Sequence, residues 1–498
     1  MTPVEPTELV AGAWQLRPWP VAHADLDDVL AERYPADAVP AERAVRLDGW
    51  QRGDLLGFAV RAATTGASVA EVLVAVAPDG RASVDAWARS GTALDPDVAD
   101  VVRRWAAGAL GLVVAPQAPG PGQRPYRAAV PTDDEALAER RRIARRGCTR
   151  WLIGHGDVSP AAWLGATAAA ATEPDLDRYG ESGEVAVLER EVADLLGTEA
   201  AVFLPSGVLA QQAALRSWAE RSPTDAVAVH GLSHLVLHEL DALTELHGLR
   251  LQLLTSEPRQ PGVADLDALA GPLAAVTLEL PLRDAGFLLP TWDELVAFSD
   301  RARERGVPLH LDGARLWESG PYYGRTYAEI VGLADSVYVS FYKGLGGMAG
   351  AALAGPADLV AQARRWQVRH GGRLFTLLPY AVSAREGLRR YLPRMGEYAE
   401  RARDLAAALD ALPGVRVLPQ PPHTNSFRLF VDVDDERLVE AGLRTAEEQH
   451  VAIALGWAGA DVPGWSMTEL VVGDATLAWP VDEQAAAVAD LVDLARSL

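Results

Sequence analysis

The residue with the most distinctive chemistry in this sequence is Lys343, which lies in the stretch SFYKGLGG at 340–347. It is the only lysine in a chain of 498 residues, in which lysine and arginine together number 46. A neutral lysine amine attacks carbonyl groups and forms a Schiff base, whereas an arginine stays protonated and is no nucleophile. The glycines that follow allow a ligand to approach the backbone closely. A surface lysine retained by chance is the alternative, and this setting favours a covalent anchor.

Two residues that suit the same chemistry lie at the end of an apolar segment, 307–312. Asp312 closes this segment, and Arg315 follows three residues later. The carboxylate can pair with the protonated ring nitrogen of pyridoxal 5'-phosphate (PLP), whose ring is an electron sink. The planar fork of an arginine binds a substrate carboxylate. Alone, the two residues would also fit a helix cap and a surface ion pair, but with Lys343 they favour a PLP site.

Three further residues are candidates for holding such a cofactor. Ser206 and Gly207 lie in a turn of small residues between an apolar segment and a helix start, and the N-terminus of a helix binds phosphate. Ser340, three residues before Lys343, is a second candidate phosphate contact. His234 is a candidate to stack on the pyridine ring, with a core or surface histidine as the alternative.

The region that carries these residues alternates short apolar segments with amphipathic ones. Such alternation predicts an α/β fold with a mainly parallel sheet that helices cover on both faces. Ligands bind these sheets at the carboxyl ends of the strands, and Asp312 and Lys343 lie at or near such ends. The predicted strands are 201–204, 226–230, 249–254, 274–280, 307–312, 336–342 and 350–355.

The chain is too long for one hydrophobic core, so several domains are expected. Residues 115–134 are rich in proline and glycine and are predicted to be a linker. We expect an N-terminal α+β domain over 1–114, a large PLP-binding domain over 135–375 and a small C-terminal α/β domain over 376–498.

Composition limits the partners and the compartment. The formal net charge of −22 argues against binding to nucleic acid or to an anionic membrane. The single cysteine, Cys148, excludes an internal disulfide and fits a reducing compartment. The sequence has no apolar run that could span a bilayer, and its first residues do not match a signal peptide. We therefore expect a cytoplasmic protein without a metal site.

Five segments, in this order and spacing, resemble the PLP-dependent L-threonine aldolases and related β-eliminating lyases of the aspartate-aminotransferase fold (fold type I). The resemblance covers roughly residues 148 to 498 and implies a seven-stranded sheet. It implies that Lys343 anchors the cofactor, that Asp312 binds the ring nitrogen and that His234 stacks on the ring. Ser206 and Gly207 would hold the phosphate, and Arg315 the substrate carboxylate. The segments are 178–197, 200–210, 232–234, 308–317 and 339–347.

The resemblance also implies a shared active site. In this family the site lies at a dimer interface, with a tyrosine and basic groups crossing over, and Tyr179 and Arg373 are the matching candidates here. We expect a homodimer or homotetramer that acts on a small-molecule amino acid.

Several positions depart from the family pattern. The family carries a threonine after the Ser-Gly of the phosphate turn, where this chain has Val208, which cannot hydrogen-bond. The family's histidine after a strand-end glutamate is missing: Glu279 is kept, but Arg283 or Asp284 would occupy that space. His155 is the candidate to supply the missing imidazole.

Two further departures concern the lysine and the substrate. Lys343 follows the aromatic pair Phe341–Tyr342 rather than a small residue. A second arginine that binds the substrate carboxylate in the family has no evident match in 467–479.

The expected function is that of a PLP-dependent carbon–carbon lyase. It would cleave or form the Cα–Cβ bond of a β-hydroxy-α-amino acid, with glycine and an aldehyde on the other side of the reaction. Removal of the Cα proton, leading to β-elimination or racemisation, is the alternative, as is a non-catalytic PLP-binding regulator. The start of the chain resembles a GNAT-type acetyltransferase but lacks its pyrophosphate loop, so docking or oligomerisation is the expected role of 1–114.

Overall fold

The structure is a computed structural model of the chain. It describes residues 135–498 throughout. Before them it describes 9–11, 14–22, 38–62, 68–77, 81–88, 113–114 and the single positions 30, 34, 98, 102, 106 and 110. The predicted linker at 115–134 lies outside the described residues. The chain divides into two compact units, Met1–Arg127 and Ala128–Leu498. No helix among the described residues is both long and apolar enough to cross a membrane.

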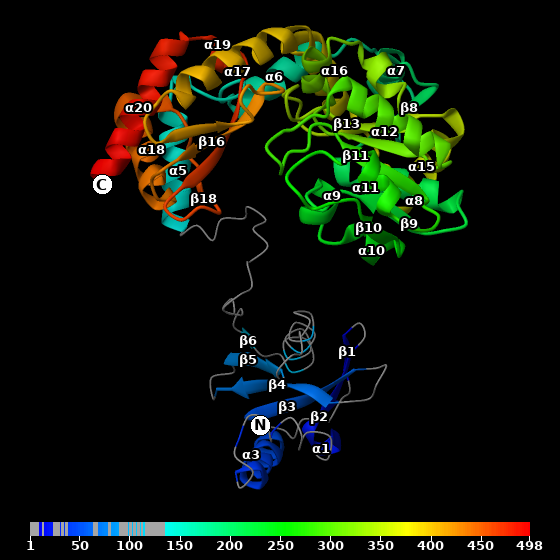
Figure 1. Cartoon of the computed structure of the whole chain (residues 1–498), viewed down its shortest axis with the longest axis vertical. Helices are drawn as coiled ribbons and strands as arrows, with labels where there is room; N and C mark the ends of the chain where they lie inside the picture. Colours follow the sequence, from blue (N-terminus) through cyan, green and yellow to red (C-terminus); the bar gives the residue numbers. More distant parts are fainter. Residues whose placement is uncertain are drawn as a thin grey trace. The chain divides into compact units, whose positions relative to one another are not determined.

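The described part of the N-terminal unit contains a six-stranded sheet with its strands in sequence order (Figure 1). Its neighbours are antiparallel except β5 and β6, which are parallel. Apolar side chains of the central strands, such as Phe58 and Val72, form a core with Trp19. The elements are β1 (Leu9–Ala11), β2 (Trp14–Pro18), α1 (Trp19–Ala22), α3 (Val39–Arg52), β3 (Leu55–Ala62), β4 (Ser68–Val76), β5 (Arg81–Ala88) and β6 (Val113–Val114).

The large domain of the second unit is built on a seven-stranded mixed sheet in the order β10-β9-β11-β12-β13-β14-β8. β10 to β13 are parallel, whereas β14 runs antiparallel to both of its neighbours. The inner strands are buried along their whole length, which is why they are continuous apolar runs in the sequence. The strands are β8 (Ala200–Leu204), β9 (Ala226–Val229), β10 (Arg250–Leu253), β11 (Ala275–Glu279), β12 (Leu309–Gly313), β13 (Ser336–Ser340) and β14 (Ala351–Gly355).

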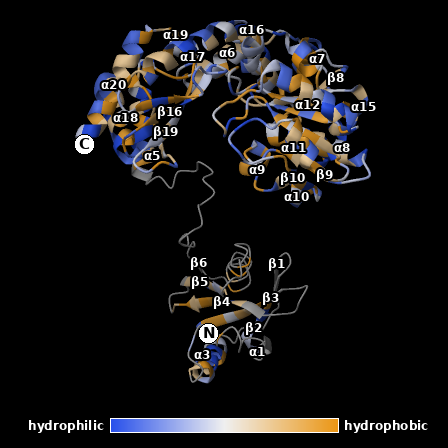
Figure 2. Cartoon of the chain, viewed as in Figure 1, coloured by the Kyte–Doolittle hydropathy of each residue, from blue (hydrophilic) through white to orange (hydrophobic). Residues whose placement is uncertain are grey.

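Helices cover this sheet, and hydrophobic residues concentrate between the layers (Figure 2). Local sequence determines where they begin and end: a capping box of Thr291 and Glu294 starts α12, and Gly197 in a left-handed conformation ends α7. The helices are α6 (Pro160–Ala170), α7 (Gly183–Leu196), α8 (Gly207–Glu220), α9 (His234–Leu237), α10 (Ala242–His247), α11 (Val263–Ala268), α12 (Trp292–Glu304), α13 (Leu316–Tyr323), α14 (Tyr327–Val331), α15 (Ala357–Arg369) and α16 (Leu378–Arg390).

The small domain is an antiparallel sheet in the order β15-β16-β19-β18, packed against helices. Its elements are η2 (Leu392–Arg394), α17 (Met395–Asp410), β15 (Val415–Leu418), β16 (Ser426–Val431), α18 (Asp435–Gln449), β17 (Val451–Ala452), β18 (Ala458–Gly459), β19 (Ser466–Val471), α19 (Asp474–Leu477) and α20 (Val481–Ser497).

The first elements of the second unit pack on this small domain, although the sequence-based boundaries put them in the large one. Strand β7 (Arg150–Trp151) pairs with β17, and Arg140 in α5 (Glu135–Gly147) forms ion pairs with Glu440 and Glu447 of α18. The periodicity of a segment carries no information about its distant packing partners. The sequence alone therefore could not show that the segment after residue 135 packs on the small domain.

Candidate active site

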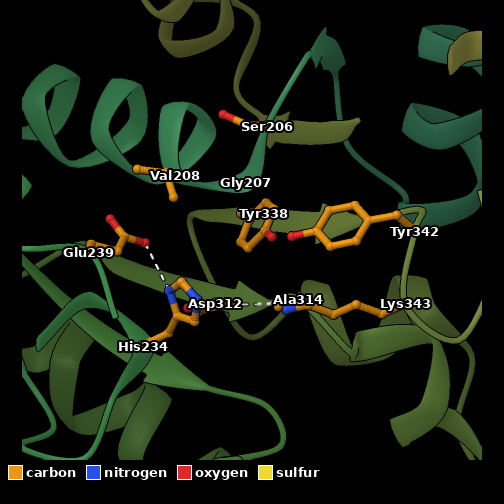
Figure 3. A pocket seen from close by; sticks show the side chains of 10 residues that line it. All are labelled: Ser206, Gly207, Val208, His234, Glu239, Asp312, Ala314, Tyr338, Tyr342 and Lys343. Carbon is orange, nitrogen blue, oxygen red and sulfur yellow. Dashed lines mark hydrogen bonds and ion pairs between the residues drawn. The ribbon is translucent and has the colours of Figure 1, made fainter. Parts of the chain in front are cut away.

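A pocket opens where the carboxyl ends of β12 and β13 meet the N-terminus of α8 (Figure 3). Lys343 and Asp312 lie on one side of it, and the turn into α8 on the other. This is the edge where ligands bind in such sheets. The lining residues are Ser206, Gly207, Val208, His234, Glu239, Asp312, Ala314, Tyr338, Tyr342 and Lys343.

Asp312 is a buried carboxylate that fits a cationic guest. It is 2% exposed, and its Oδ1 accepts a hydrogen bond from the Ala314 N–H at 3.1 Å. Burial raises the pKa of Asp312, which the positive charges of Lys343 and His234 oppose. In the part of the chain that the structure describes, no arginine or lysine forms an ion pair with Asp312. Because a buried charge is costly without a partner, a protonated ring nitrogen is the guest that this position suits.

Lys343 follows β13, in the connection to β14. Burial lowers the pKa of its amine, and the charge of Arg315 lowers it further. Both effects favour the neutral amine that reacts with a carbonyl. The backbone N–H of Gly344 donates to Glu318 Oε1 at 3.1 Å, which fixes the turn directly after the lysine.

The turn before α8 is suited to bind an anion. Ser206 caps the helix, since its Oγ accepts a hydrogen bond from the Leu209 N–H at 3.3 Å. The first N–H groups of a helix have no partner within it and attract anions. Only a glycine fits at position 207, because a Cβ there would lie 2.0 Å from Tyr338 Oη. Val208 lines the same end of the pocket without a polar side-chain group.

His234 is held from two sides at the start of α9. Its backbone N–H donates to Glu279 Oε2 at 2.9 Å, and its Nδ1 lies 3.1 Å from Glu239 Oε1. Burial lowers the pKa of His234, but the hydrogen bond with Glu239 and the charge of Asp312 outweigh it, so the pKa is raised overall. Burial raises the pKa of the Glu239 carboxyl, and its hydrogen bond with His234 opposes this effect.

Arg315 begins α13 beside the site without lining the pocket. Its Nη1 lies 3.6 Å from Glu318 Oε1, and its guanidinium lies 5.3 Å from the centre of the Phe287 ring. Phe287 belongs to the loop after β11, so this loop and Arg315 border the same space.

Tyr179 and Arg373 are brought together, but away from the pocket of the same chain. The Arg373 Nε donates to the Tyr179 carbonyl at 3.1 Å, and its guanidinium lies 5.4 Å from the tyrosine ring. Both side chains are exposed. Among the described residues of one chain, they do not contribute to the lining of the site.

His155 and Ser340 lie behind the pocket and bind backbone groups. His155 Nε2 is 2.9 Å from the Gly344 carbonyl, and its Nδ1 accepts the Asp474 N–H at 3.3 Å. A carbonyl only accepts, so Nε2 carries the proton, and both ring nitrogens are occupied. Ser340 Oγ donates to the Ala314 carbonyl at 2.6 Å. In this structure both residues support the loops around Lys343 and do not line the pocket.

Sequence reasoning did not single out Glu239, Glu318 and Tyr338. Glu318 follows Arg315 by three residues, a helical spacing that could have been noticed. His238 follows His234 by four residues, a helical spacing that also could have been noticed. Its Nε2 lies 2.7 Å from Asp284 Oδ2, and its ring centre lies 5.1 Å from that of His234.

Comparisons with known proteins show the family of the chain. The profile of the beta-eliminating lyase family matches residues 159–434. A solved structure from Exiguobacterium sp. 255-15, described as an aromatic amino acid beta-eliminating lyase/threonine aldolase, is 40% identical with a TM-score of 0.67 and covers 71% of this chain and 99% of its own. A structure from Listeria monocytogenes, described as an L-allo-threonine aldolase, is 35% identical with a TM-score of 0.67, covering 72% and 99%. The low specificity L-threonine aldolase of Escherichia coli O157:H7 is 31% identical over 274 residues, which are 53% of this chain and 79% of that enzyme.

The fold and the relatives define a PLP-dependent lyase of fold type I. This chain belongs to the beta-eliminating lyase family, as a threonine-aldolase-like member, and its cofactor is PLP. The members of this family are enzymes whose small-molecule substrates are amino acids.

Proposed function

We propose that the enzyme cleaves or forms the Cα–Cβ bond of a β-hydroxy-α-amino acid, with glycine and an aldehyde as the other reactants. The observation that carries this proposal is one pocket that joins a buried carboxylate, Asp312, to a lysine with a lowered pKa, Lys343. The threonine aldolases among its relatives favour an aldol reaction over other PLP chemistry.

Each side chain has a separate task in this proposal. When bound, PLP withdraws the electrons of a bond broken at the substrate α-carbon into its protonated ring. Asp312 would hold the ring nitrogen in its protonated form, and Lys343 would anchor the cofactor and then exchange protons as a neutral amine. His234 would stack on the ring, and Ser206 with the backbone of Gly207 would bind the phosphate.

Arg315 orients the substrate in the proposed reaction. Its guanidinium would bind the α-carboxylate through two parallel hydrogen bonds and so hold the α-carbon in one orientation. Arg315 rests on Phe287 and lies within ion-pairing distance of Glu318, so the fork is held before substrate arrives.

The assembly proposed for this enzyme is a homodimer with shared sites. Helix α6 presents apolar side chains to solvent along most of its length, among them Trp163 and Leu164. Tyr179 and Phe375 are exposed as well, and their rings pack edge to face. An apolar surface of this kind marks an interface, and a second copy would bring Tyr179 and Arg373 to the neighbouring pocket.

Proton NMR in heavy water tests the reaction with a panel of β-hydroxy-α-amino acids and with glycine. Formation of glycine and an aldehyde is the expected result. Deuterium at Cα with an intact carbon skeleton would instead establish racemisation or another proton transfer, and a keto acid would establish β-elimination. Bound PLP without turnover of any amino acid would favour a regulator.

The role of Lys343 has its own test. Lys343→Ala is expected to bind PLP without the visible absorption band of the wild-type protein and to lose turnover almost completely, because the chain has no second lysine. An unchanged visible spectrum would contradict the assignment of the anchor.

A further inference from the structure

Two tyrosines lie together at the phosphate end of the pocket. Tyr338 lies on β13 and is the register partner of Asp312 on β12, so both side chains project from the same face of the sheet. Tyr342 follows two residues after that strand ends. Both line the pocket, and Figure 3 shows their hydroxyl groups facing each other between Lys343 and the turn into α8. Neither residue has a role in the function proposed above.

The position of Tyr338 is determined by contact with α8. Tyr338 is 4% exposed. Its Oη lies 2.0 Å from the point where a Cβ of Gly207 would stand. The phenol therefore reaches the first residue of the helix, at the end where a phosphate binds. Val208, the next residue of the helix, offers no hydrogen-bond donor from its side chain.

The hydroxyl groups of Tyr338 and Tyr342 carry two protons that can be donated in hydrogen bonds. Two facing phenols share one hydrogen bond, which uses one of their two protons and leaves the other for an outside acceptor. Burial raises the pKa of Tyr338 well above its ordinary value, and it raises that of Tyr342 too. Both groups therefore keep their protons near neutral pH. A phosphate dianion carries only acceptors, so it is the ligand that such a pair suits.

The two residues differ in their access to the pocket. Tyr338 is enclosed, whereas Tyr342 is 42% exposed. We propose that the Tyr338 hydroxyl donates to Tyr342, and that Tyr342 donates its own proton to the phosphate group of PLP. The tyrosine pair thereby supplies the side-chain donor that Val208 lacks.

Cofactor binding to the apo-protein tests this inference without any turnover. Dissociation constants are measured for PLP and for pyridoxal, which lacks the phosphate, with the wild-type protein, Tyr342→Phe and Tyr338→Phe. A hydrogen bond to a charged group predicts that Tyr342→Phe weakens PLP binding roughly ten- to a hundredfold and leaves pyridoxal binding unchanged. Tyr338→Phe is expected to cause a smaller loss that is also confined to PLP. Equal losses for both ligands, or no loss for PLP, would overturn the proposal.

A double variant and a control variant complete the test. Val208→Thr in the Tyr342→Phe background restores a hydroxyl at the same end of the pocket and is expected to recover at least part of the affinity for PLP. A double variant that binds PLP no better than Tyr342→Phe would show that the two positions do not serve one acceptor, and the assignment would fail. Tyr322→Phe is the matched control, because Tyr322 stacks on His423 outside the pocket, and it should leave both constants unchanged.

Discussion

Two neighbouring carboxylates determine the charge that the pocket accepts. Glu279 and Asp312 are register partners at the ends of β11 and β12, and both are buried. Burial raises the pKa of Glu279 to about 7, and the nearby charge of Asp312 adds to the effect. Glu279 accepts hydrogen bonds from the backbone N–H groups of His234 and Arg283, which favour its ionised form. With one lysine beside two carboxylates, a further positive charge is favourable here, and the ring of PLP provides it.

The pair of His234 and Glu239 gives a prediction about pH. Glu239 is one of the groups that raise the pKa of His234, so Glu239→Gln should lower that pKa. If His234 accepts a proton from the substrate, kcat/KM rises with pH as the imidazole loses its proton, and in Glu239→Gln this rise moves to lower pH. Histidine NMR titrations and pH profiles of both proteins measure the shift. If the pKa of His234 falls but the pH profile of kcat/KM does not shift, His234 does not accept the substrate proton. Its role would then be limited to stacking on the ring.

At the scale of elements, the strand pattern predicted much of the site. Asp312 and Lys343 were expected at strand ends because their apolar runs are short and continuous, and both line the pocket. The antiparallel direction of β14 could also have been predicted from the sequence. Only about ten residues separate it from β13, which is too few for a crossover helix, so the chain must return antiparallel.

Contacts between distant segments could not be predicted from the sequence. His238 meets Asp284 across 46 residues, and Arg428 of β16 binds the same carboxylate across 144. Arg428 also faces Glu469 on β19, so this polar cluster joins the small domain to the loop after β11. The periodicity of a segment determines which of its faces is buried, and it does not determine which other segment covers that face.

The fit of α16 against the loop after Lys343 gives a steric prediction. A Cβ on Gly387 would lie 2.4 Å from the backbone oxygen of Leu345, and a backbone atom cannot turn aside as a side chain can. Gly387→Ala is therefore expected to lower the free energy of unfolding by about 1–3 kcal/mol and to weaken PLP binding, since the turn after Lys343 must shift. Thermal unfolding and PLP titration measure both effects.

The matched control is another helical glycine. Gly396 in α17 has open space where its Cβ would stand, so Gly396→Ala should keep or slightly increase stability through its better helix propensity. Similar losses in both variants would mean that the close approach to Leu345 is not the cause.

At the scale of the whole molecule, the second unit accounts for the family relationship. The family profile matches residues 159–434, which lie in this unit, and the Exiguobacterium structure matches 71% of this chain along 99% of its own length. The N-terminal unit has its own sheet and its own core, which includes the buried ion pair of Arg46 and Glu71. We propose docking or assembly as its role.

The exposed apolar face of α6 gives the second unit a surface for assembly. A charge in the middle of an apolar interface has to be desolvated without a partner, so Leu164→Glu on α6 should weaken the proposed dimer about thirtyfold or more. Leu246→Glu is the matched control, since Leu246 is equally exposed on α10, away from α6. Light scattering across a dilution series measures the mass of each variant. Because Tyr179 and Arg373 are proposed to reach the neighbouring pocket, dissociation of Leu164→Glu should reduce turnover while each chain still binds PLP. A dimer that survives Leu164→Glu but dissociates in Leu246→Glu would place the interface on the other face, and Tyr179 and Arg373 would then lose their proposed role.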